Sequence, residues 1–146
     1  SQLDNNERFR LLGMEQFVAA VSPKDAQQLK AHNKNELTML SELRQIIVAS
    51  KHYPLPDSRV LVSDSYWYSD NLSMAIDMVE QGLGWGNFPL SVVQTHFAKQ
   101  SLVRLAFLDT TNGLDMPIHA IWPAYKPLSK SMQLLIELWE KQIHRT

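Results

Sequence analysis

The sequence predicts an α/β domain with a mostly parallel sheet in its middle part. Short apolar segments typical of buried strands alternate there with amphipathic helical segments. Residues 74–89 join a helix, a buried strand and a second helix with almost no loop. Such a unit suits the wall of a ligand cleft, where backbone and helix ends approach a small molecule.

Composition narrows the class of protein. The chain has 146 residues, enough for one domain with a real core, and is 45% hydrophobic and 20% charged. Its net charge of −1 gives no basic excess to neutralise a phosphate backbone. We expect no membrane association, because the sequence has no membrane-length apolar run and no signal peptide. The lack of cysteine excludes thiolate chemistry and fits the cytoplasmic location that we expect.

A helical stripe opens the central unit. Leu72, Ala75, Ile76 and Val79 recur at i, i+3, i+4 and i+7, which predicts one buried helix face. Ser69 or Asp70 is expected to cap the start of this helix. Gly82 suits the left-handed position that ends it.

A glycine-spaced strand follows. Residues 83–88 are short and apolar, as in a buried strand whose end something approaches closely. Pro89 suits the first turn of the next helix, because its missing N–H would be unpaired there anyway. Gly82, Gly84 and Gly86 do not match the dinucleotide-binding fingerprint, because a helix and not a strand precedes them.

The remaining elements are read in the same way. Further strands are expected at residues 45–49, 59–65, 102–105 and 117–122, and helices at residues 36–43 and after Ser129, which can cap the final one. Residues 24–35 read as a loop or short helix, and residues 50–58 as a loop. Residues 9–21 read as a long strand or a hairpin interrupted at Gly13. This segment could pair with residues 117–122 in a separate small layer.

Candidate ligand contacts follow from the position of strand and helix ends. In α/β folds ligands meet the carboxyl ends of parallel strands and the starts of helices. Serine and asparagine there could hydrogen-bond a small polar ligand, and a tryptophan could cover it. The rule selects Ser50, Ser65, Trp67, Ser69, Asp70, Asn71, Asn87 and Phe88. The alternative for each is purely structural, with Ser69 and Asp70 as helix caps and Trp67 as packing.

Motifs for catalysis and metal binding are missing from the sequence. The five histidines have no metal-ligand spacing, and no Gly-x-Ser-x-Gly elbow occurs. We therefore expect a binding module that is not an enzyme, with no metal or cofactor. A periplasmic solute-binding protein and an enzyme on a related α/β scaffold stay open as alternatives.

Several segments together resemble the effector-binding domain of LysR-type transcriptional regulators. The resemblance begins at residues 10–18 and 21–23 and continues through residues 36–37 and 45–48. Its strongest piece is residues 79–89, Val-Glu-Gln-Gly-Leu-Gly-Trp-Gly-Asn-Phe-Pro, similar to the family's v-x-x-G-l-G-w-x-x-l-P. Residues 102–105 and 117–122 resemble later strands of the same family. The order and spacing of these segments make the resemblance fairly specific.

The resemblance implies a type 2 periplasmic-binding-protein-like fold with an effector in an interlobe cleft. Residues 22–106 would form the complete second lobe, and residues 1–21 and 107–146 the remnant of the first. The implied function is effector sensing and oligomerisation in a bacterial regulator, with DNA bound only through a helix-turn-helix domain absent from this chain. The implied partners are an unknown small-molecule effector and a second copy. Residues 50–58 are too short for a helix that often helps form the family's dimer interface, so the usual dimer is not assured.

Overall fold

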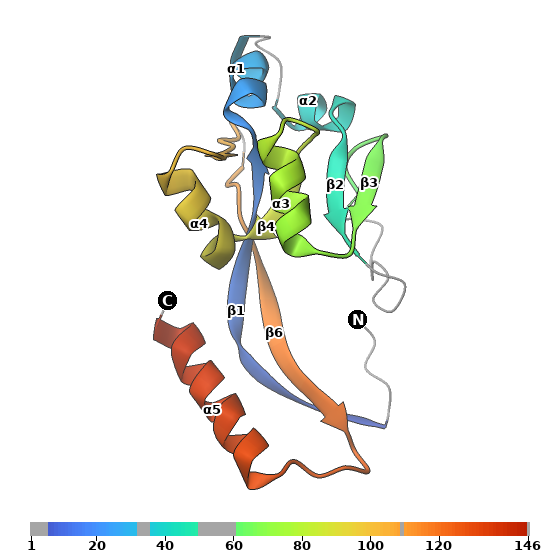
Figure 1. Ribbon diagram of the computed structural model, residues 1–146, viewed down its shortest axis with the longest axis vertical. Helices are drawn as coiled ribbons and strands as arrows, with labels where there is room; N and C mark the ends of the chain where they lie inside the picture. The colour runs from blue at the N-terminus through green and yellow to red at the C-terminus, as the bar shows by residue number, and fades with distance from the viewer. Residues whose placement is uncertain (1–5, 32–35, 50–60, 109, 146) are drawn as a thin grey trace. The chain divides into compact units, whose positions relative to one another are not determined.

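The computed structural model describes residues 6–31, 36–49, 61–108 and 110–145 (Figure 1). The helices and strands follow in the order β1 (Glu7–Val21), α1 (Pro23–Ala31), α2 (Glu36–Glu42), β2 (Gln45–Val48), β3 (Tyr66–Ser69), α3 (Leu72–Glu80), β4 (Gly86–Pro89), α4 (Leu90–Ala98), β5 (Val103–Arg104), β6 (Leu114–Pro123) and α5 (Lys130–Arg145). The chain forms two compact units: unit 1 is Ser1–Gln16 with Asp115–Thr146, and unit 2 is Phe17–Leu114. The lobe boundaries given above stay a prediction.

Unit 2 contains a mixed arrangement of strands. β1 pairs antiparallel with β4 and with β5, whereas β2 and β3 pair in parallel. A parallel bridge between Gln45 and Trp85 connects β2 to the start of β4. Because β1 lies between β4 and β5 and is antiparallel to both, β4 and β5 run in the same direction as each other and as β2 and β3. The mostly parallel arrangement expected for the middle of the chain is therefore correct for β2, β3, β4 and β5, and β1 is the antiparallel strand.

Two hydrophobic clusters cover the two faces of β1 in unit 2. Val18 and Ala20 belong to one cluster, and Ala19 and Val21 to the other. All four residues are buried, as the period of two along a strand requires when both faces are covered. The first cluster includes the predicted buried face of α3, and the second includes Trp85 and Leu40.

The glycine-rich segment adopts most of its expected conformation. Gly82 has φ +79°, which confirms the left-handed residue after α3. A Cβ on Gly84 would meet the carbonyl group of Arg44, so a side chain there is incompatible with the close approach of β2. Pro89 is the N-cap of α4, one position earlier than expected, and the strand before it is shorter than predicted.

Two local expectations are wrong. Asn71, not Ser69 or Asp70, caps α3, and its side chain accepts a hydrogen bond from the backbone N–H of Met74 at 3.0 Å. All three residues are chemically able to cap, so the final direction of the chain decides among them. Residues 61–65 do not form a strand; β3 begins at Tyr66, where aromatic side chains favour strand. The predicted loop at residues 50–58 lies outside the described residues.

Unit 1 consists of the first part of β1, most of β6 and the helix α5. β6 pairs with β1, and the backbone N–H of Ala124 donates to the carbonyl of Asn6 at 2.7 Å, so the predicted pairing of these distant segments is confirmed. β1 is one strand without interruption at Gly13. The Ser129 hydroxyl accepts from the backbone N–H of Met132 at 3.2 Å, as predicted for the cap of the last helix.

Candidate effector-binding edge

The carboxyl ends of three strands meet at one edge of unit 2. Val48 of β2 lies opposite Ser69 of β3. The bridge of Gln45 to Trp85, three residues earlier, places Val48 level with Phe88 of β4. Helices α3 and α4 begin directly after β3 and β4, so both helix starts lie along this edge (Figure 1). We call it the carboxyl edge.

Ser69 and Asn71 form a compact turn at the start of α3. The Ser69 hydroxyl donates to the carbonyl of Asn71 at 2.9 Å and accepts from the Asn71 backbone N–H at 3.2 Å. Asn71 caps the helix through Oδ1, and no hydrogen bond to its amide NH₂ is found among the described residues. Both Asn71 and Asp70 are exposed. The turn therefore presents one amide donor and one carboxylate beside a helix start.

The start of α4 is the second polar part of the carboxyl edge. Pro89 makes no side-chain hydrogen bond to cap this helix. Because the first backbone N–H groups of a helix have no partner within it, the start of α4 can bind an acceptor. Asn87 is exposed two residues earlier, on β4 opposite Ala19 of β1. Four predicted site residues, Ser69, Asp70, Asn71 and Asn87, are thus placed at or next to this edge.

The other predicted site residues have different positions. Ser65 lies before β3, where its carbonyl accepts from Gln45 at the opposite end of β2. Trp67 lies opposite Ile46, two residues before the end of β3. Phe88 is fully buried in the core, so its side chain is not available to a ligand. Ser50 lies outside the described residues.

Trp67 has a partner that sequence reasoning missed. The Arg44 guanidinium lies over the indole ring, with Cζ 3.7 Å from the ring centroid, while 43% of Trp67 stays exposed. Tyr66 and Tyr68 make an edge-to-face contact with ring centroids 5.5 Å apart. Arg44 immediately precedes β2, and Trp67 lies on β3, which follows about twenty residues later in the chain. The sequence around Arg44 does not indicate that β3 pairs with β2, so the contact could not be predicted.

Asn112 is a second residue that the sequence did not single out. Its amide donates to the carbonyls of Ala19 and Leu105 at 2.9 and 2.8 Å, and Oδ1 accepts from the Ala19 N–H at 2.8 Å. The side chain therefore hydrogen-bonds the buried backbone of β1 at Ala19, next to the short ladder that pairs Ala20 and Val21 with β5. An asparagine followed by glycine reads as a turn, and that signal does not reveal a buried role.

Two of the described histidines make side-chain contacts with other residues. His96 Nδ1 lies 2.5 Å from Glu80 Oε1, which connects the ends of α4 and α3. His119 makes an edge-to-face contact with Phe9 at 5.6 Å. Across the described ranges, no three His, Cys, Asp or Glu residues are placed to hold a metal ion. None of the helices described is both long enough and apolar enough to cross a membrane.

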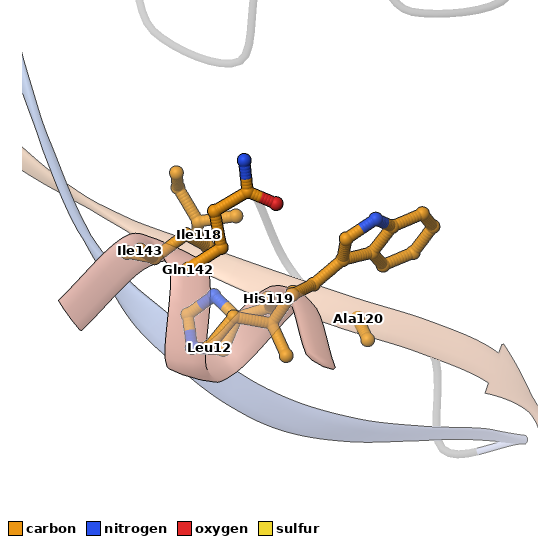
Figure 2. Close-up of a pocket in the computed structure, with 7 residues that line it drawn as sticks. Leu12, Ile118, His119, Ala120, Gln142 and Ile143 are labelled. Carbon is orange, nitrogen blue, oxygen red and sulfur yellow. The ribbon is translucent and has the colours of Figure 1, made fainter. Parts of the chain in front are cut away.

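Unit 1 has a hollow of about 370 Å³ that contains none of the predicted site residues. It is lined by Leu12, Ile118, His119, Ala120, Trp139, Gln142 and Ile143. Figure 2 shows the lining side chains of the two strands beside those of α5. The lining is mainly apolar, unlike the carboxyl edge of unit 2.

The architecture and the family comparison together identify the class of protein. The chain has a mixed α/β fold of the type 2 periplasmic-binding-protein-like kind, and its partial coverage of solved domains fits one lobe. The family described as "LysR substrate binding domain" matches residues 2–143. The chain belongs to this family, which is a class of transcriptional-regulator domains and not an enzyme class.

Solved structures agree on the fold. ArgP from Mycobacterium tuberculosis superposes with TM-score 0.68 at 17% identity, over 94% of this chain and 47% of that one. The regulatory domain of MetR from N. meningitidis gives TM-score 0.68 at 16% identity, over 98% and 66%. Full-length LysG from Corynebacterium glutamicum with bound effector Arg superposes with TM-score 0.66 at 14% identity, over 98% of this chain and 48% of that one.

The chain spans about half the length of the full-length regulators and about two-thirds of the MetR regulatory domain. Among curated proteins no match was found.

Proposed function

We propose that this chain is the effector-sensing part of a LysR-type transcriptional regulator. A small polar metabolite binds at the carboxyl edge of unit 2, where Asn71 and Asn87 supply amide groups and the start of α4 supplies backbone N–H groups. The observation that carries the proposal is the convergence of three strand ends and two helix starts on one edge. The family supports it, because its domains bind substrates.

Regulation would follow from differential binding. An effector shifts a conformational equilibrium only by the difference in its affinity for the two states. We propose that closure of the implied two-lobed domain around the metabolite changes DNA binding by a separate helix-turn-helix domain. The regulator would act in the cytoplasm as an oligomer. In this proposal the chain is a binding module and not an enzyme.

The proposal is tested by thermal unfolding of this chain with a panel of small polar metabolites. A ligand at about 100 times its dissociation constant stabilises the folded state by about 2.7 kcal/mol and raises the melting temperature. Asn71→Ser keeps a good helix cap but removes the amide NH₂, so the fold should persist while the ligand-induced shift decreases. Asn87→Ala should also reduce the shift.

Ser65→Ala is the matched control, because Ser65 is an exposed polar residue at the opposite end of β2. The proposal predicts an unchanged shift for this variant. A metabolite whose stabilisation survives Asn71→Ser and Asn87→Ala but disappears in Ser65→Ala would place the site elsewhere and refute the assignment.

A further inference from the structure

The first turn of α1 contains a buried carboxylate without a partner. Asp25 is 9% exposed, and its Oδ2 atom is buried and makes no hydrogen bond. Within the described ranges, no lysine, arginine or histidine side chain forms an ion pair with this carboxylate. A charge held away from water without a counter-charge is strongly unfavourable. Asp25 is therefore expected to have a partner that the described part of the chain does not supply.

The helix α1 itself favours a negative charge at this position. Ser22 precedes the helix, and its hydroxyl accepts a hydrogen bond from the backbone N–H of Asp25 at 3.1 Å. Asp25 is the acidic residue of the first turn, where a helix carries partial positive charge. The carboxylate is thus stabilised on the side of its own helix, and a cation suits its other side.

The other side of Asp25 faces the end of α3, and Figure 1 shows this end beside the start of α1. The point where a Cβ of Gly82 would lie is 3.7 Å from Ser22 Oγ and 3.9 Å from Asp25 Oδ2. Apart from Gly82 and its two chain neighbours, no other heavy atom of the described residues lies within 4 Å of this point. Two oxygen atoms therefore border a space that can accept a small ion.

The end of α3 adds oxygen atoms with partial negative charge. The backbone N–H groups of Gly82 and Leu83 donate to carbonyls of the preceding turn at 3.0 and 3.1 Å, which ends the helix. Among the described residues, no hydrogen bond to the carbonyls of Glu80 and Gln81 is found. Free carbonyls give a helix end partial negative charge, so they repel a nearby carboxylate. A cation between Asp25 and this helix end removes the repulsion.

We propose that Asp25, Ser22 and the end of α3 form a binding site for a monovalent metal cation, sodium or potassium. All the donors are oxygen atoms, which such hard cations prefer. The site has one carboxylate, which balances one positive charge, and no three His, Cys, Asp or Glu residues of the described ranges are grouped for a metal ion. The cation would join the start of α1 to the end of α3. This inference does not depend on effector binding, because the carboxyl edge lies at the start of α3.

Thermal unfolding in different chloride salts tests the site. Sodium or potassium chloride at about 0.2 M is compared with N-methylglucamine chloride at the same concentration, so that the ionic strength stays constant. A cation at about ten times its dissociation constant should raise the melting temperature by about 4 °C. Asp25→Asn removes the charge at nearly unchanged size, so it should fold and lose this shift. Asp77→Asn is the matched control, because it removes an exposed carboxylate from α3 and should keep the shift.

Sodium NMR gives a second measurement that does not depend on stability. The sodium signal should broaden more with the wild-type chain or Asp77→Asn than with Asp25→Asn, and circular dichroism checks that each variant is folded. Equal melting-temperature shifts and equal broadening for the wild-type chain and Asp25→Asn would overturn the proposal, and so would the absence of any shift in the wild-type chain. A larger shift with about 5 mM calcium chloride that Asp25→Asn abolishes would overturn the assignment to a monovalent cation.

Discussion

Replacing Gly84 by alanine tests the closest backbone approach in unit 2. The new Cβ would lie 3.0 Å from the carbonyl carbon of Arg44 and nearer still to its oxygen, whereas ordinary contact begins near 3.4 Å. The same oxygen accepts the backbone N–H of Trp85 at 2.9 Å, and the Trp85 carbonyl accepts from Ile46 at 2.8 Å. The added methyl group therefore forces β2 and the start of β4 apart and weakens both hydrogen bonds.

The expected cost combines two effects. Overpacking in a dense core costs about 1–3 kcal/mol, and weakening two buried hydrogen bonds adds about 1 kcal/mol each. We expect Gly84→Ala to lower the free energy of unfolding by about 3–5 kcal/mol. With a urea m-value of about 2 kcal/mol/M, the midpoint falls by about 1.5–2.5 M.

Two neighbouring variants serve as controls in the same urea titration. Leu83→Ala changes a side chain that is 42% exposed and should alter stability by less than about 0.5 kcal/mol. Gly82→Asn keeps a residue that tolerates a positive φ, and the nearest atoms to its Cβ lie 3.7 Å away, so its cost should stay below about 1 kcal/mol. A Gly84→Ala midpoint equal to that of either control would refute the close approach.

Three further predictions use the same folded chain. Asn112→Ala should cost about 2–4 kcal/mol in urea unfolding, because it removes the side-chain acceptor of the buried Ala19 N–H and a side-chain donor to the carbonyls of Ala19 and Leu105, and an unchanged midpoint would contradict this role. Gln100 has φ +62°, so Gln100→Gly should raise stability by about 0.5 kcal/mol, the left-handed strain outweighing the entropy of glycine; a lower melting temperature would count against it. With a net charge of −1, this chain alone should show no sequence-selective submicromolar binding to DNA in about 0.15 M salt by fluorescence anisotropy.

The local parts of the fold could be predicted because their signals lie within a few residues. The spacing of Ala75, Ile76 and Val79 identifies the buried face of α3, and all three are buried. Gly82 ends that helix region for a steric reason that is local to one residue. The hydroxyl of Ser129 likewise caps α5 three residues before the N–H that it accepts.

The parts that could not be predicted depend on distant segments. Val60 and Val62 alternate like a strand, yet the strand beside β2 begins at Tyr66, because the pairing partner decides which segment is used. Trp67 acquires Arg44 only after that pairing is formed. The residues of the carboxyl edge were predictable only in part. Asn71 and Asn87 could be placed because they lie next to helix starts in the sequence. Ser65 was misplaced because its position depends on where β3 begins.

The sequence of residues 9–21 allowed two interpretations, a long strand or a hairpin interrupted at Gly13, and the structure of β1 shows why. Its residues 18–21 are small, apolar and buried on both faces, while residues 7–11 alternate charge and apolar character and are exposed. One continuous strand thus passes through two different environments, and Gly13 lies in the part that belongs to unit 1. A glycine at this point suggested a hairpin, but its missing side chain admits Ile143 of α5. The same close packing fixes which side of α5 faces the strand, and Leu134 and Leu138, on another side of the helix, stay exposed.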